Sequence, residues 1–290
     1  LNKGQNSLEA RLSRVIQDER TMRDRVRGLL VRVNQSGAAA EPLSFQSEFD
    51  DSSTFQRTLL SDAGAILDLA GDEREHLSQK AEKERSPEDQ GRLVQLQNLE
   101  HYLDLGRGTM ADVARLLRRL QGDRAHRQAD VAVTQLKRAL EQLQDPVTVL
   151  KGLTADELQT MGQTRGLAEI KARSQQLPVA GAKDAPKVEA PAWLTASLLA
   201  DQQKELHSRT SELLLRLKAG VEHEAKNPHQ PDPNKPQDPR EAAQRQRMME
   251  GAKQAIPLIQ EGIAAMERAN TTLATEQLQP ATKAQVEALA

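Results

Sequence analysis

The chain has 290 residues, a formal net charge of −2 and no cysteine. The nearly balanced charge argues against a protein whose main partner is a polyanion, and the lack of cysteine excludes disulfides, thiolate nucleophiles and Cys-ligated metal sites. Aromatic residues make up only 2% of the sequence. The abundance of Leu, Ala, Gln, Arg and Glu instead favours helices that pack through narrow apolar stripes. No apolar run reaches the roughly 18 residues of a transmembrane helix.

Apolar residues in the first segment recur at alternating spacings of four and three residues. This spacing is a heptad seam, interrupted by Glu19, and it predicts a long helix over 5–35 that ends near Gly37. The seam residues are Leu8, Leu12, Val15, Met22, Val26, Leu29 and Val33.

Four further helices are predicted in the same part of the chain. The segment 86–89 (Ser-Pro-Glu-Asp) combines a capping Ser, Pro in the first turn and acids near the helix N-terminus. Gly106 and Gly108 should weaken or bend the helix that follows. A capping box is expected at 154–157 (Thr-Ala-Asp-Glu). The predicted helices cover 53–85, 87–121, 124–144 and 155–176.

Two Pro-rich segments interrupt the helical pattern. Residues 178–192 are typical of a linker, and residues 227–239 contain five prolines, which excludes a helix there. We therefore expect an all-α, elongated bundle of long antiparallel, coiled-coil-like helices. It should form two helical units, over 1–177 and 193–290.

The second unit is predicted to hold a long helix on each side of the Pro-rich loop. The seam of the last long helix runs from Met249 to Leu273, with Pro257 inside it as an expected kink. A short helix from Pro280 runs to the end of the chain, so we expect this unit to be truncated. The start at Leu1 rather than Met suggests a processed or excised piece, from which a signal peptide or membrane anchor has been removed.

The two units share a short similarity. Residues 25–33 and 209–217 keep the same spacing of arginines and leucines. Heptad sequences resemble one another by composition alone, so a true duplication and a chance likeness both stay open. The Leu/Gln/Arg-rich composition, the missing Met and the Pro-rich linkers resemble large coiled-coil and helical-repeat proteins of the bacterial cell envelope. That resemblance implies a scaffold role and a periplasmic or envelope location.

Charge is segregated along the first unit. Residues 41–89 carry thirteen acids against five bases, and residues 107–138 carry eight bases against three acids. An acidic helix that pairs with basic neighbours along its flanks explains this pattern. Alternatively, the arginines expose a surface for an acidic protein, a phospholipid or a nucleic acid, although no aromatic residues interleave them for base stacking. The candidate surface consists of Arg115, Arg118, Arg119, Arg124 and Arg127.

Two helical spacings could present metal ligands. Glu73 and His76, and likewise Asp123 and His126, lie three residues apart, as in di-iron carboxylate bundles. Glu73 lies in a run of charged residues and Asp123 lies in a helix break, which favours solvated surface instead. The histidines that flank the Pro-rich loop, His223 and His229, are interpreted as incidental. No nucleophile elbow or phosphate-binding loop occurs. The sequence therefore predicts no catalytic, cofactor-binding or metal site.

Trp193 is the sole tryptophan and stands between the linker and a heptad helix. Two interpretations apply: it staples the linker onto the bundle, or it is an exposed anchor for a partner.

Taken together, these patterns predict a scaffold that is not an enzyme and mediates protein–protein contacts. Its partners would be other proteins or a second copy in a homodimer, with no small-molecule substrate. Membrane contact would come through the missing anchor. Binding to an anionic membrane or nucleic acid through the arginines is the first alternative. A metal-binding bundle built on His76 and His126 is the second.

Overall fold

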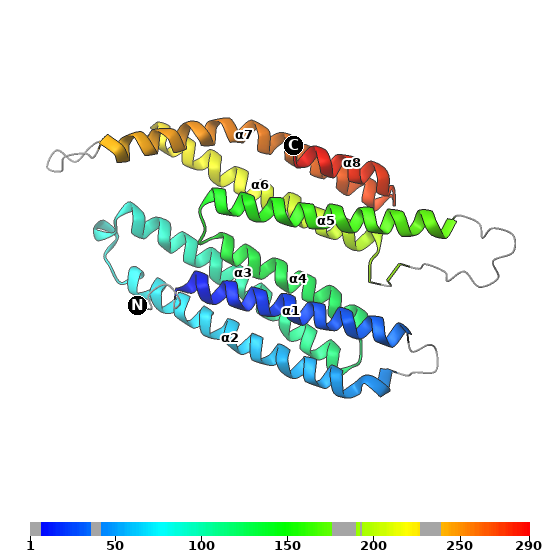
Figure 1. The fold of residues 1–290 in the computed structure, drawn as a ribbon. Helices are drawn as coiled ribbons and strands as arrows, with labels where there is room; N and C mark the ends of the chain where they lie inside the picture. Colours follow the sequence, from blue (N-terminus) through cyan, green and yellow to red (C-terminus); the bar gives the residue numbers. More distant parts are fainter. Residues whose placement is uncertain (1–6, 36–41, 176–189, 192, 227–238) are drawn as a thin grey trace. The chain divides into compact units, whose positions relative to one another are not determined.

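The all-α fold class is confirmed, and the described residues form helical bundles (Figure 1). Every regular element in them is helical, and no strand occurs there. Within the described residues, no helix combines the length and the hydropathy of a membrane-spanning segment. The computed structural model describes residues 7–35, 42–175, 190–191, 193–226 and 239–290.

The chain divides into two compact units, here called unit 1 and unit 2. Unit 1 consists of Leu1–Asp145 with Pro191–Trp193, and unit 2 consists of Pro146–Ala190 with Leu194–Ala290. The division thus falls between α4 and α5, whereas we expected it in the linker over 178–192. Most of that linker, and all but the last residue of the Pro-rich segment 227–239, lie outside the described residues.

Unit 1 contains four long helices whose apolar seams form one core. The seam of the first helix is buried as predicted, with Leu12, Met22 and Val26 fully inaccessible. The second helix begins at Gln46, well before the predicted residue 53, and Phe49 in its first turn packs into the core and is 2% exposed. The helices are α1 (Leu8–Gln35), α2 (Gln46–Ser78), α3 (Pro87–Arg118) and α4 (Gly122–Glu141), with 3₁₀ turns at Pro42–Phe45 and Glu82–Glu84.

The ends of α3 follow known capping geometries. The predicted start is confirmed: the Ser86 hydroxyl accepts from the Asp89 amide at 3.1 Å, and the Asp89 carboxylate accepts from the Ser86 amide at 3.0 Å. At the other end Leu120 adopts φ 57°, and the Gln121 amide donates to the Leu116 carbonyl at 3.0 Å. This is the left-handed turn with which helices often end, formed here without glycine.

Close packing of helices in unit 1 depends on two glycines, Gly106 between α3 and α4 and Gly122 beside α1 and α2. Helix α3 continues through Gly106 and Gly108. A Cβ on Gly106 would lie 3.2 Å from Leu136 Cδ2 of α4, whereas a Cβ on Gly108 would meet open space. At the start of α4, a Cβ on Gly122 would lie 2.7 Å from Leu30 Cδ2. Gly106 is therefore a packing position.

Unit 2 contains α5 (Pro146–Gln175), α6 (Ala196–Lys226), α7 (Pro239–Ala274) and α8 (Leu278–Ala288). Helix α5 packs against α6 and α8. Helix α7 also packs against α6 and α8. This packing is the reason that α5 groups with unit 2.

Two prolines have different effects in unit 2. Helix α5 begins at Pro146, where we expected the preceding helix to stop and the next to begin near residue 155. Proline suits the first turn of a helix because its missing amide has no intrahelical acceptor there. Helix α7 continues on both sides of Pro257.

Candidate interaction surfaces

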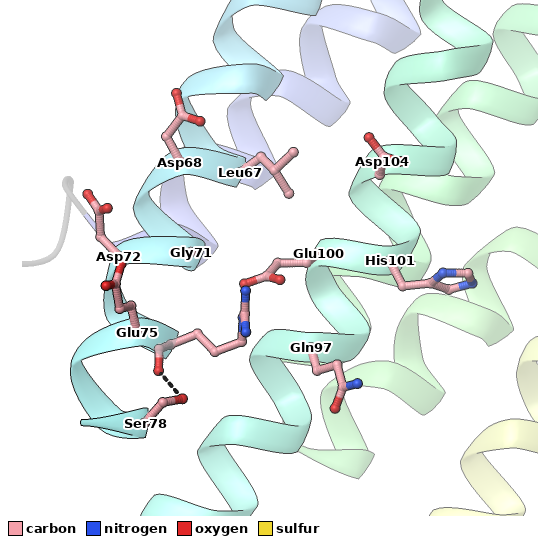
Figure 2. Close-up of a pocket in the computed structure, with 11 residues that line it drawn as sticks. Leu67, Asp68, Gly71, Asp72, Glu75, Ser78, Gln97, Glu100, His101 and Asp104 are labelled. Atoms are coloured by element: carbon pink, nitrogen blue, oxygen red, sulfur yellow. Dashed lines mark hydrogen bonds and ion pairs between the residues drawn. The ribbon is translucent and has the colours of Figure 1, made fainter. Parts of the chain in front are cut away.

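An open acidic groove lies between α2 and α3 (Figure 2). Asp68, Asp72 and Glu75 recur on α2 at spacings of four and three, so they share one face of that helix. Glu100 and Asp104 lie four residues apart on α3, across the groove. The groove has a volume of about 980 Å³ and brings these five carboxylates together.

Two of the five carboxylates are ion-paired, both with arginines of unit 1. Arg74 Nε donates to Glu100 Oε1 at 2.7 Å, and Arg107 Nη1 lies 3.8 Å from Asp104. The three acids on α2 are exposed and form no ion pair with any residue that the structure describes. The groove, here called the acidic groove, therefore presents an excess of negative charge to solvent.

The five arginines that we predicted as a surface lie around the turn between α3 and α4, and all are exposed. Arg115 Nη2 donates to Asp112 at 2.6 Å, and Arg124 Nη1 donates to the Gln121 side chain at 3.1 Å. The other three form no ion pair within the described parts of the chain. The full set, here called the arginine cluster, is Arg115, Arg118, Arg119, Arg124 and Arg127.

Flank pairing between helices does occur, but through other residues. Arg92 of α3 binds both oxygens of Glu73 on α2, with distances of 2.7 Å and 3.1 Å. Arg23 of α1 donates to Asp130 of α4 at 3.0 Å. The arginine cluster is absent from these interhelical pairs, so its charge remains available to solvent.

Trp193 packs against α1 and α4 of unit 1. Its ring lies 5.4 Å from the His126 ring, and Arg27 Cζ lies 5.5 Å from its centre. Its indole nitrogen is buried without a hydrogen-bond partner among the described residues. The ring that we considered as a partner anchor is thus in contact with side chains of its own chain.

The candidate metal ligands have other surroundings. Glu73 is bound by Arg92, and His76 is exposed on α2. We expected His126 on the solvated surface, but it is 2% exposed beside Trp193. Burial lowers its pKa, although the charge of Asp130 acts against this effect. His223 is exposed, and His229 lies outside the described residues. Within the described ranges, no three His, Asp or Glu side chains are placed to hold a metal ion.

A buried carboxyl–amide pair lies in the core of unit 1. Gln56 Nε2 of α2 donates to Glu19 Oε2 of α1 at 2.7 Å, and both side chains are fully inaccessible. Glu19 Oε1 and Gln56 Oε1 have no hydrogen-bond partner in the described structure. Burial raises the pKa of Glu19 to about 7, although the Gln56 hydrogen bond and the Arg23 charge act against it.

Unit 2 contains a second such pair. Gln203 Nε2 of α6 donates to Glu157 Oε2 of α5 at 2.8 Å, and Gln285 Nε2 of α8 donates to Gln203 Oε1 at 2.8 Å. All three side chains are fully inaccessible, and burial raises the pKa of Glu157 to about 7. The capping box expected at 154–157 is wrong, because these residues lie inside α5.

Glu157 also borders a cavity of about 190 Å³ in unit 2. The wall is otherwise mostly apolar and comes from all four helices of the unit and from the residues after α8. Its lining includes Leu150, Leu153, Thr210, Leu258, Ile259 and Met266.

The sequence indicated only part of these sites. Glu19 stood out as a polar interruption of a seam, but nothing in the sequence identified Gln56 as its partner. The acidic groove was visible only as an excess of acids over 41–89.

Comparison with protein-family models, with curated proteins and with solved structures finds no match for this chain.

Proposed function

We propose that the protein is a non-catalytic scaffold that binds other proteins through the surfaces of its long amphipathic helices. In this proposal neighbouring helices pack antiparallel, in the manner of coiled-coil hairpins, and the two units are related. The observation that carries the proposal is the acidic groove, where three carboxylates of one helix face stand exposed without a described cation.

Electrostatics explains why such a groove suits a basic protein segment. Like charges one turn apart on a helix destabilise it by a few tenths of a kcal/mol per pair. Glu100 and Asp104 add negative charge from the opposite wall. A segment with Lys or Arg would relieve this repulsion, and complementary charge would raise its association rate.

The test compares two triple variants of the full chain as bait in a lysate of the source organism. Asp68→Asn, Asp72→Asn and Glu75→Gln neutralise the groove. The matched control neutralises Asp50, Asp51 and Asp62, which are exposed elsewhere on the same helix. We expect a protein that binds wild type and the control but is lost from the groove variant and in high salt, because the attraction is screened. Equal retention by all three baits would contradict the proposal.

The arginine cluster favours a second candidate function, binding to an anionic membrane or to nucleic acid. Arg118, Arg119 and Arg127 are exposed and form no ion pair in the described structure. Replacement of these three by Gln should abolish salt-sensitive retention on heparin and on anionic vesicles if this function applies. Wild-type chain that passes both matrices at low salt would exclude it. The homodimer and the envelope location stay predictions.

A further inference from the structure

We propose that each unit contains a proton switch: a buried carboxylic acid that is paired with a glutamine amide and locks the helices when protonated. In unit 1 the acid is Glu19 on α1 and the amide is Gln56 on α2. In unit 2 the acid is Glu157 on α5 and the amide is Gln203 on α6. Loss of the proton near neutral pH loosens the contact between the two helices. This proposal does not depend on the scaffold function.

The hydrogen-bond geometry favours the protonated acid. An ionised carboxylate only accepts hydrogen bonds, which leaves Gln56 Oε1 without a donor in the core. A protonated Glu19 can donate from its second oxygen to Gln56 Oε1 while it accepts from Gln56 Nε2. Acid and amide then satisfy each other in both directions, and both unpartnered oxygens gain a partner.

The same chemistry applies in unit 2. Gln203 Oε1 already accepts from Gln285, but a carbonyl oxygen has a second lone pair. A protonated Glu157 can therefore donate to that oxygen. Hydrogen bonds among Glu157, Gln203 and Gln285 then connect α5, α6 and α8, and the proton on Glu157 completes this network.

One residue of each pair lies at an equivalent position in the two units. The similarity between residues 25–33 and 209–217, extended in register toward the N-terminus, places Glu19 opposite Gln203 and Met22 opposite Leu206. All four of these side chains are buried. At this position the acid lies on α1 in unit 1 and the amide lies on α6 in unit 2, and each core contains one carboxyl–amide pair.

Few charges near either acid can stabilise its ionised form. Around Glu19, α1 itself presents Arg23, but that guanidinium is bound to Asp24 and to Asp130 of α4, and α2 presents the neutral Gln56.

Around Glu157, Arg209 of α6 is bound to the neighbouring Asp156 at 2.8 Å, α8 presents Gln285, and the cavity residues of α7 are apolar. Ionisation of either acid therefore places a poorly compensated charge in a core.

The pH dependence follows from the direction of the pKa change. Both acids have pKa values of about 7 in the folded chain, against 4.5 for an ordinary glutamate. Below pH 4.5 both folded and unfolded chains hold the proton, and between pH 4.5 and about 7 only the folded chain holds it. Stability therefore falls as pH rises through this window. The full loss is about 300-fold in the folding equilibrium of each unit.

The test uses Glu19→Gln and Glu157→Gln in the full chain. Glutamine mimics the protonated acid, because its own amide can donate where the acid hydroxyl would. Urea unfolding at pH 5 and pH 8.5 is followed by Trp193 fluorescence for unit 1 and by hydrogen exchange of α5 and α6 for unit 2. For each variant we compare the folding equilibrium constant of the substituted unit with that of wild type. The ratio of variant to wild type should be about 70-fold larger at pH 8.5 than at pH 5. The exposed controls Glu84→Gln and Glu261→Gln should show no such growth.

A second measurement does not depend on unfolding. Infrared spectra at about pH 6 should show the carbonyl stretch of a protonated carboxylic acid in wild type. The band should be reduced in each single variant and fall to the background of the exposed carboxyl groups in the double variant. A wild-type spectrum without this band would overturn the proposal. So would a variant advantage that is the same at both pH values.

Discussion

The close approach of α3 and α4 predicts opposite results for two glycines on one helix. Gly106 and Gly108 both lie inside α3, and in each case alanine should add about 1 kcal/mol of helix propensity. A Cβ at 108 meets no atom within 4 Å, so Gly108→Ala should stabilise unit 1 by about 1 kcal/mol.

Gly106→Ala adds the same propensity and a steric cost. Its Cβ would lie 3.2 Å from Leu136 Cδ2 and 3.6 Å from Gln135 Cβ. Leu136 is fully buried, so overpacking should cost about 1–3 kcal/mol. The net change lies between zero and a loss of about 2 kcal/mol.

The assay is urea unfolding with Trp193 fluorescence, because the sole tryptophan packs on α1 and α4. The difference in unfolding free energy between the two variants isolates the steric term, since propensity cancels. If Gly106→Ala stabilises unit 1 as much as Gly108→Ala does, the close packing of α3 on α4 is refuted.

Two further predictions concern single contacts. Asp156→Ala removes the carboxylate that lies 2.8 Å from the buried Arg209 and should destabilise unit 2 by about 3 kcal/mol. The measurement is hydrogen exchange in urea, which should become faster in α5 and α6. Glu222→Ala, which breaks the exposed pair with Lys226, should change little, and equal effects would contradict this account. Ser86→Ala removes the cap of α3 and should lower the unfolding free energy of unit 1 by about 1 kcal/mol. The measurement is urea unfolding followed by Trp193 fluorescence, and an unchanged urea midpoint would show that the cap contributes nothing.

Local sequence patterns predicted the positions of helices better than they predicted which helices pack together. The seam of α1 could be predicted because apolar spacing reports directly which face is buried, and the start of α3 because its cap is formed by adjacent residues. The start of α5 was predicted at 155 instead of Pro146, because proline can either follow a helix or begin one. Only the packing of α5 on α6 and α8 decides between these two readings.

The candidate sites depended even more on tertiary structure. The arginine cluster could be predicted because its members are close in sequence. Glu157 resembled a surface acid in a capping box, and its burial depends on Gln203, which is remote in sequence. The acidic groove likewise requires α2 and α3 to lie side by side, which composition alone does not specify.

The contact of Trp193 with His126 and Arg27 affects the order of assembly during synthesis. Helices α1 to α4 leave the ribosome before α5, but the tryptophan that covers their surface follows only after residues 146–190. A nascent chain that has released α4 from the ribosome, but not yet residue 193, therefore carries four helices with an uncovered His126 ring. Unit 1 acquires its last contact only when synthesis of unit 2 is already under way.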